Sequence, residues 1–300
     1  MVLFHTDDAA LCASANGGAI AAWEAGLARS MSLMAPCPGL PEMAVWLRAH
    51  REVDAGVHVT LTSEFPEFRW KPLSAPAAAP GLCAGDGGFH PDTRSLIAHA
   101  AADEVEREIR AQVRAVQDAG VTVGHMDCHM ASVYAHREFC ARFLAVGVEL
   151  GIPVLLEGGG LSRRARLRHD ARRVLRHLRA KANADFPLPP GDLVEHAWQA
   201  GQPVVDWIYA DTYVWPAGEK VARMAALPRQ LRPGITVVLL HCAVPGEDFG
   251  KLGSTGAGRC ADTEAMISPA LREAVTEAGV HCTTWKELSE RRKAITSRSD

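Results

Sequence analysis

The 300-residue sequence lacks the features that mark membrane, secreted and nucleic-acid-binding proteins. It has no apolar run that approaches the ~18 residues of a membrane span. Its N-terminus has no basic region followed by a long apolar stretch. Positive charge is not in excess, because 32 Lys and Arg stand against 35 Asp and Glu, for a formal net charge of -3. We therefore expect no membrane partner, no nucleic-acid partner and a cytoplasmic location.

The sequence also lacks a disulfide framework. None of its eight cysteines forms a Cys-x-x-Cys pair, and their spacing is irregular. This usage is typical of a reduced protein. Cys128 and Cys242 each adjoin a histidine of interest. We interpret both as small buried residues and not as metal ligands or nucleophiles.

One stretch departs from the even charge balance. Eight arginines lie between residues 162 and 180. A nucleic-acid contact is one interpretation, but the net negative charge and the absence of an accompanying motif favour a solvated helix face.

Strand-like and helix-like patterns alternate along the chain some seven or eight times, which indicates a parallel α/β fold in a single domain over residues 1–300. The strands are expected at residues 2–5, 31–34, 54–62, 121–129, 152–156, 203–213, 235–240 and 280–284. Polar residues recur where these strands end. Sites drawn from several strand ends are typical of a (β/α) barrel. An open doubly wound sheet is the alternative, although its ligands usually lie at one switch point.

Residues 121–129 concentrate the polar groups. The segment begins as a β-branched strand and then carries His125, Asp127 and His129. Residues two apart on a strand point the same way, so these three side chains should share one face. His58 follows the same rule, because it alternates with valines and shares a face with Thr60. Two imidazoles and a carboxylate suit zinc or another divalent metal.

Two carboxylates follow the first strand directly. Asp7 and Asp8 are adjacent and cannot point the same way, so one can bind a metal while the other faces substrate or water. An aspartate can also cap a helix. The helical pattern begins later, however, and Ser14 or Asn16 is the better cap candidate.

Two further segments have features of a site. His241 follows the apolar strand 235–240 and precedes a Pro-Gly turn. Residues 63–99 form a long Pro- and Gly-rich segment, and loops of this length usually cover a site or are flexible. Its aromatic residues could stack on a sugar ring or bury themselves beneath the loop, and both interpretations stay open.

Taken together in chain order, these motifs resemble those of the YdjC-like carbohydrate deacetylases, the ChbG/HpnK family. The matching segments are His5-Thr-Asp-Asp8, Ser30-Met-Ser-Leu-Met34, Gly56-Val-His-Val-Thr-Leu61, Gly124-His-Met-Asp-Cys-His129, His241 with its Pro-Gly turn, and the Arg259 to Asp262 segment. No single motif is specific, but the ordered set spans nearly the whole chain.

The resemblance implies a distorted (β/α) barrel of about seven strands that removes an N-acetyl group from an amino sugar. It implies one divalent metal ion, magnesium or zinc, and a small-molecule or oligosaccharide substrate beneath a loop at about residues 63–100. A homodimer is possible, since related barrels often pair. The implied roles are metal ligands at Asp8, His58 and His129, a general base at Asp7, a general acid or amine stabiliser at His241, and supporting groups at His125, Asp127 and Arg259.

The sequence departs from the family pattern in three places. Asp7-Asp8-Ala9-Ala10 replaces the usual Asp-Asp-Phe-Gly, and the usual His-Pro-Gly is stretched to His241-Cys-Ala-Val-Pro-Gly246. A further histidine found in many members after the His129 position is absent. These departures indicate a subgroup and leave the acetylated substrate open.

Two other functions fit the same residues. A metal-dependent hydrolase could act on another ester or phosphoester bond, although two-metal phosphoesterases usually need more ligands. A non-catalytic carbohydrate-binding barrel would fit the altered segments after Asp8 and His241. Metal stoichiometry and acetate release distinguish these alternatives.

Overall fold

A computed structural model of the chain describes residues 1–158 and 189–296. Its centre is one sheet of six parallel strands. The strands are β1 (Val2–Ala9), β2 (Ala28–Leu33), β3 (Asp54–Val59), β4 (Met126–Cys128), β5 (Trp207–Tyr209) and β6 (Thr236–Leu240). The predicted parallel α/β fold is confirmed.

Helices connect the strands, as a parallel sheet requires. The α-helices described are α1 (Ala13–Glu24), α2 (Leu40–Ala49), α3 (Thr93–His99), α4 (Ala102–Asp118), α5 (Arg137–Leu150), α7 (Gly191–Gln199), α8 (Lys220–Ala226), α9 (Gly256–Ile267), α10 (Pro269–Glu277) and α11 (Trp285–Thr296). Short 3₁₀ helices follow several strands, including His129–Ala135 after β4 and Asp211–Val214 after β5.

The strand order is β4-β3-β2-β1-β6-β5, so the first strand lies beside the last. Leu3 of β1 pairs with Val237 of β6, and Thr6 pairs with Met31 of β2. Because all neighbouring strands are parallel, the carboxyl ends of all six lie at one edge of the sheet. The site residues at or just after the carboxyl ends of β1, β3, β4 and β6 therefore converge.

The residue patterns predicted eight strands and the family resemblance about seven, whereas the sheet of the described residues has six. Two expected strands, at residues 152–156 and 280–284, are reduced to single parallel bridges, Met126 to Val154 and Val2 to Cys282. Pro153 has no N–H to donate to a ladder, which limits pairing at the first of these segments. At the second, α11 begins only three residues after Cys282.

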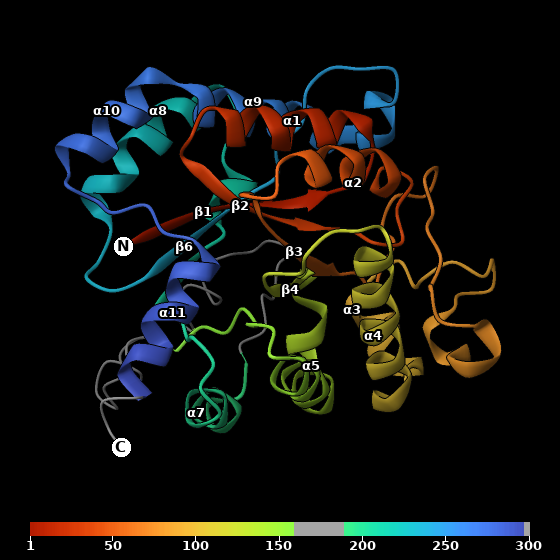
Figure 1. Cartoon of the computed structure of the whole chain (residues 1–300). Helices are drawn as coiled ribbons and strands as arrows, with labels where there is room; N and C mark the ends of the chain where they lie inside the picture. The colour runs from red at the N-terminus through yellow and green to blue at the C-terminus, as the bar shows by residue number, and fades with distance from the viewer. Residues whose placement is uncertain (159–188, 297–300) are drawn as a thin grey trace.

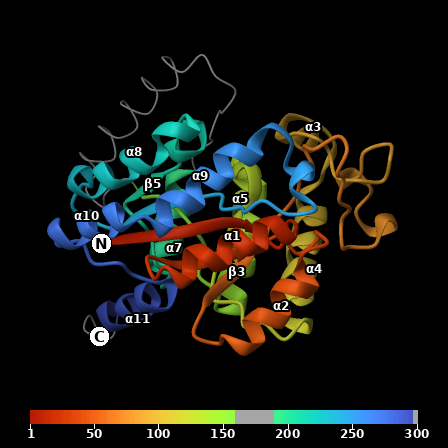
Figure 2. The same ribbon diagram turned by 90° about the horizontal axis from the view of Figure 1, so that it is seen from above.

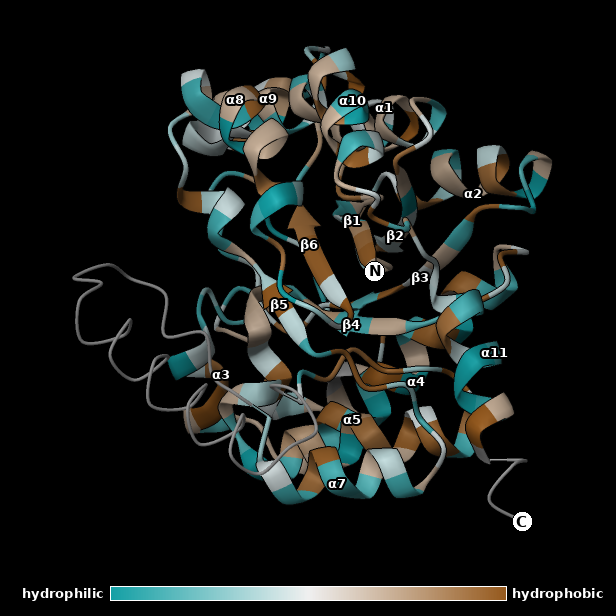
Figure 3. Cartoon of the chain, turned by 90° about the vertical axis from the view of Figure 1, so that its left-hand side faces the viewer, coloured by the Kyte–Doolittle hydropathy of each residue, from teal (hydrophilic) through white to brown (hydrophobic). Residues whose placement is uncertain are grey.

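Helices lie on both sides of the sheet (Figure 1). Helices α1, α8, α9 and α10 form one layer, and α4, α5 and α7 form another on the opposite side, so the strands occupy the centre of the molecule (Figure 3). Helices α1 and α9 run side by side over β1 (Figure 2).

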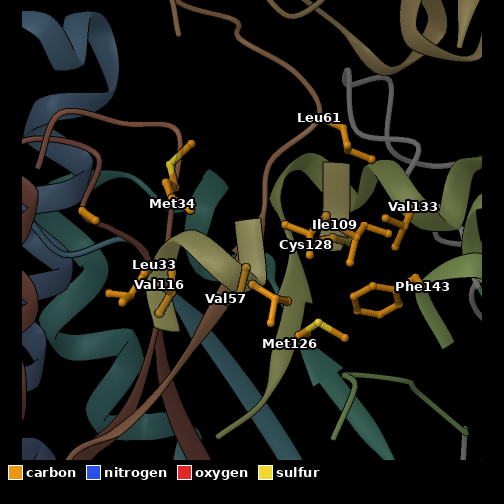
Figure 4. Packing of buried hydrophobic residues seen from close by; sticks show 14 of the residues in the cluster. Leu33, Met34, Val57, Leu61, Ile109, Val116, Met126, Cys128, Val133 and Phe143 are labelled. Carbon is orange, nitrogen blue, oxygen red and sulfur yellow. The ribbon is translucent and has the colours of Figure 1, made fainter. Parts of the chain in front are cut away.

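The largest apolar cluster fills the space between the strands and helices α4 and α5 (Figure 4). Val57 of β3 and Met126 of β4 are fully buried there against Ile109 of α4 and Phe143 of α5. Burying a side chain of this size contributes roughly 1.5–3 kcal/mol. This packing holds β3 and β4, which carry His58 and Asp127, in fixed register.

The start of α1 differs from the expected cap. Cys12 occupies the N-cap position and its side chain makes no capping hydrogen bond. Instead, Asp248 accepts hydrogen bonds from the backbone N–H groups of Ala13 and Ser14, at 2.7 and 2.9 Å. Asn16 accepts a hydrogen bond from the N–H of Ala10, at 2.9 Å. The local prediction of Ser14 or Asn16 as cap was wrong because a distant carboxylate takes that role.

Two expectations concern other parts of the chain. The arginine-rich segment falls within residues 159–188 and lies outside the described residues. In the described part of the chain, no helix combines the length and apolar character needed to cross a bilayer.

Candidate active site

The site begins where β1 turns away from the sheet. Asp8 has φ 59° and Ala10 has φ 69°, both in the left-handed region that non-glycine residues rarely adopt. The left-handed turn at Asp8 separates the two neighbouring carboxylates. Ala10 stands where the family pattern has glycine, yet it adopts the conformation that suits glycine. Backbone strain of this kind, of order 1–3 kcal/mol per residue, often marks functional sites.

Asp8, His58 and His129 lie together, as the implied ligand set requires. Asp8 Oδ1 is 3.2 Å from His58 Nε2 and 3.2 Å from His129 Nδ1. All three side chains are buried, and one ligand atom from each lies within 4.8 Å of the others. The three residues come from the ends of β1, β3 and β4, which are 121 residues apart at the extremes.

Asp127 supports His58 from behind. Its Oδ1 is 2.7 Å from His58 Nδ1, which leaves His58 Nε2 facing Asp8. Burial alone would lower the pKa of His58, but the charges of Asp127 and Asp7 raise it well above the usual range. A carboxylate on the far nitrogen of a ligating histidine fixes its tautomer and orientation.

His5 links Asp127 to Asp7. Its Nε2 lies 2.6 Å from Asp127 Oδ2 and 3.2 Å from Asp7 Oδ1, and its Nδ1 is 2.9 Å from Ser30 Oγ. Burial acts to lower the pKa of His5, but hydrogen bonding to Asp127 and Asp7 and their charges raise it to about 9. His5 therefore lies within ion-pair distance of the Asp7 carboxylate.

His125 lies deeper than the other members of its motif. It is fully buried, and its ring stacks on Trp285 of α11 with centroids 5.4 Å apart. Its Nδ1 is 3.4 Å from Asp54 Oδ1, and Asp54 accepts a hydrogen bond from the backbone N–H of Trp285. The ring also meets that of His5 edge-on at 5.0 Å. His125 thus supports the site through His5.

Asp7 and His241 face each other across the site. Asp7 Oδ2 is 3.9 Å from His241 Nε2, and burial lowers the pKa of His241. Tyr213, which is 52% exposed, meets the His241 ring edge-on at 5.2 Å. A carboxylate, an imidazole and an exposed aromatic ring are therefore adjacent at the mouth of the site.

Helix α9 fixes both sides of this arrangement. Arg259 Nη2 donates to Asp8 Oδ2 at 2.7 Å, which leaves Oδ1 for the histidines. Asp262 accepts from the backbone N–H of His241 at 3.1 Å and from the buried Lys220 Nζ at 2.7 Å. Burial acts to raise the pKa of Asp8, but the Arg259 and His129 charges hold it well below its usual range.

The sequence did not indicate Glu64, which the structure places against His129. Its Oε2 and Oε1 lie 2.9 and 3.1 Å from His129 Nε2. Nearby in the same loop, Trp70 and Phe89 are buried, whereas Phe65 and Phe68 are partly buried. The two fully buried rings therefore pack beneath the loop. The Trp70 ring also lies edge-on to His129, 6.1 Å away.

The donor set fits a divalent metal ion. His58 Nε2, His129 Nδ1 and Asp8 Oδ1 face one another, and the opposite nitrogen of each imidazole already has a carboxylate partner. In the described residues, two other groups of three also bring their ligand atoms within 4.8 Å of one another, and both contain Asp127. Asp127 is committed to His5 and His58 by hydrogen bonds. Asp8, His58 and His129 are thus the grouping best suited to hold one ion.

A family model described as YdjC-like protein matches residues 1–277. The chain belongs to the YdjC-like family. Among YdjC-like relatives, the carbohydrate deacetylase of Thermus thermophilus is 26% identical over 299 residues, covering 97% of this chain and 94% of its own.

A carbohydrate deacetylase of Listeria monocytogenes is 29% identical over 131 residues, which is 43% of this chain. That match spans 50% of the Listeria protein's own length. A solved structure from Enterococcus faecalis, of a protein proposed to cleave cellobiose phosphate, superimposes with a TM-score of 0.76. It is 17% identical and covers 96% of this chain and 98% of its own. At 17% identity, the superposition shows that this YdjC-like chain and the Enterococcus protein share a fold.

The residues that sequence analysis missed share a physical reason. Glu64 lies in a loop and Tyr213 in the short 3₁₀ helix Asp211–Val214, where no period of two or 3.6 residues indicates which way a side chain points. His5 belongs to the first motif, but its partners Ser30 and Asp127 are 25 and 122 residues away. Only the parallel register of β1, β2 and β4 brings these groups together.

Proposed function

We propose that this protein is a metal-dependent carbohydrate N-deacetylase, which hydrolyses the amide of an N-acetylated amino sugar. The observation that carries the proposal is the convergence of Asp8, His58 and His129 beside Asp7, with His241 on the other side of the Asp7 carboxylate. Full-length similarity to a relative named carbohydrate deacetylase supports it.

Asp8, His58 and His129 would hold the divalent ion. When bound, a divalent cation supplies the Lewis acidity that polarises an amide carbonyl and lowers the pKa of water. Two nitrogen ligands and one oxygen ligand favour zinc over magnesium, which prefers oxygen ligands. Arg259 holds Asp8 in the orientation that presents Oδ1 to the two histidines.

Asp7 is the general base in this proposal. Its Oδ1 is held 3.2 Å from His5, and its Oδ2 faces the mouth of the site toward His241. Asp7 removes the proton of the attacking water. Although burial lowers the pKa of His241, the proposal uses its protonated form, which donates a proton to the departing amine nitrogen, since an amine leaves more readily when protonated. Asp262 fixes the His241 backbone for this role.

The substrate approaches beside one exposed aromatic ring. Tyr213 offers an exposed ring face beside His241, and sugar rings pack well against such faces. A hollow of about 550 Å³ lies between the segment after β2 and residues 68–73. Trp70 lines this hollow, and its ring also lies edge-on to His129. We assign this hollow to the part of the carbohydrate beyond the acetylated sugar.

We also infer that the six-stranded sheet is part of a distorted barrel. Residues 154–157 bridge the gap between its outer strands, because Val154 pairs with Met126 of β4 and Glu157 pairs with Val205, two residues before β5. Closing the sheet would exclude water from beneath the site, where His5, Asp127 and His125 are already buried.

The test is acetate release from a panel of N-acetylated sugars. Metal-stripped enzyme is assayed alone and after addition of zinc, magnesium, manganese or cobalt, and bound metal is counted per chain. We expect one metal per chain and acetate only from the loaded enzyme. Protein that binds one metal, binds sugars and releases no acetate would be a carbohydrate-binding barrel. Two metals per chain, with phosphoester cleavage, would support the other hydrolase.

A further inference from the structure

We propose that Glu64 is a positioning residue that orients His129 for metal binding through Nδ1 and thereby ties the substrate-covering loop to the metal centre. This inference rests on the proposed function, because it takes His129 as a ligand. Glu64 itself would not contact the ion or the reacting atoms.

The two histidines of the ligand set have matching surroundings. His58 presents Nε2 to Asp8 and binds Asp127 through Nδ1, at 2.7 Å. His129 presents the opposite nitrogen, Nδ1, to Asp8 and binds Glu64 through Nε2, at 2.9 Å. A neutral imidazole that ligates a metal through one nitrogen carries its proton on the other. Asp127 and Glu64 therefore each accept that proton's hydrogen bond and fix one tautomer.

The two carboxylates differ in where they come from. Asp127 lies in strand β4 and its side chain is 3% exposed. Glu64 lies in the loop after β3, and its side chain is 23% exposed. The orientation of His58 is therefore set by the sheet, whereas that of His129 depends on the position of a loop.

The loop is folded so that it can hold Glu64 in place. The backbone N–H of Trp70 donates to Ser63 Oγ at 3.1 Å, and its indole N–H donates to the carbonyl of Thr62 at 2.7 Å. Arg69 donates to the carbonyls of Ser63 and Phe89. These bonds close residues 62–70 into a compact turn. Glu64 and the Trp70 ring then contact His129 from the same turn.

The turn and the metal site should stabilise each other. If Glu64 favours the metal-binding orientation of His129, then bound metal must favour the closed turn by the same free energy. Loss of a carboxylate behind a ligating histidine typically lowers metal affinity 10–100-fold. Because residues 68–73 also line the hollow assigned to the carbohydrate, loading of the metal would preorganise that surface.

The experiment compares metal binding by four purified, metal-stripped proteins: the wild type, Glu64→Ala, Glu64→Gln and Glu67→Ala. Glu67 is a matched control because it lies in the same turn and is exposed. Zinc and cobalt affinities are measured by titration calorimetry. Hydrogen–deuterium exchange of residues 62–70 is followed with and without metal, and circular dichroism verifies folding.

We expect Glu64→Ala to bind zinc about 10–100-fold more weakly than the wild type and to lose metal-induced protection of residues 62–70. Glu64→Gln should retain most of the affinity, because its amide oxygen still accepts a hydrogen bond from His129 Nε2. Glu67→Ala should bind like the wild type.

Three results would overturn the inference in different ways. Equal zinc affinity of the wild type and Glu64→Ala would remove Glu64 from the positioning role while leaving the ligand set intact. An equally large loss in Glu64→Gln would show that the charge itself is needed, as for a direct ligand. A wild type that binds no metal would instead overturn the proposed function.

Discussion

At the residue scale, the proposed mechanism divides the polar groups of the site between metal binding and proton transfer. Asp8 is turned toward two histidines by its left-handed backbone and by Arg259. Asp7, one residue earlier, lies within ion-pair distance of His5 and of His241. Adjacent carboxylates with different partners can take different roles, which single substitutions should separate.

We expect Asp7→Asn to lower kcat at least ~100-fold while metal affinity stays that of the wild type, because a proton acceptor is lost and no ligand is removed. His58→Ala should lose both metal and activity. Steady-state acetate release and metal titration measure the two effects. An active Asp7→Asn enzyme would exclude Asp7 as the base.

Tyr213→Ala should raise KM about tenfold, equivalent to roughly 1.4 kcal/mol of lost binding, with a smaller effect on kcat. The reason is that Tyr213 offers an exposed ring at the mouth of the site and lies next to, but outside, the proton-transfer pair. Val214→Ala is the matched control, since Val214 is its exposed neighbour. An unchanged KM in Tyr213→Ala would place the sugar elsewhere.

At the element scale, a glycine allows the backbone of one strand to lie close to a buried side chain of the site. Gly56 of β3 lies against the buried His125 ring, and a Cβ there would be 2.3 Å from Nε2. Glycine thus makes room for the ring that stacks on Trp285 and connects α11 to the base of the site. Asp248, which caps α1 from over 230 residues away, is a second such long-range contact.

Gly56→Ala should lower the free energy of unfolding by about 1–3 kcal/mol, because the His125 ring has no space into which to move. Gly218→Ala serves as control, since nothing lies within 4 Å of the position a Cβ would take there. Urea unfolding of the metal-free proteins measures both. Wild-type stability in Gly56→Ala would mean that the His125 ring is not tightly enclosed.

At the scale of the whole molecule, buried charge pairs around the site affect the stability of the metal-free protein. His5 and His129 are buried beside carboxylates; although burial opposes the charged form, these partners raise the pKa of each to about 9. A histidine whose pKa is raised in the folded state stabilises it below the unfolded value, near 6.5. This contribution is lost as the pH rises through 9.

The free energy of unfolding of the metal-free protein should therefore fall between pH 6.5 and 10. The contribution of His5 alone is of the order of 3 kcal/mol. Urea unfolding across this range should show a smaller fall in His5→Gln than in the wild type. The same slope in both proteins would contradict the charged state assigned to His5.

The sequence by itself determined the parallel α/β class and which strand ends carry polar residues. It could do so because strand and helix periodicities are local, and the order of motifs led to the YdjC-like family, which the family model confirms. The proposed ligand and proton-transfer residues were implied by the resemblance to that family. Asp8, His58 and His129 then proved to lie together in space.

Only the tertiary structure decided how those residues are supported. His5 bridges Asp7 and Asp127, Glu64 contacts His129, and Asp248 caps α1 through contacts between segments distant in sequence. The same holds for the number of strands, since the segment at residues 152–156 pairs at Val154 by a single bridge. Such contacts depend on strand register, loop conformation and packing, which arise from the whole chain and leave no local period in the sequence.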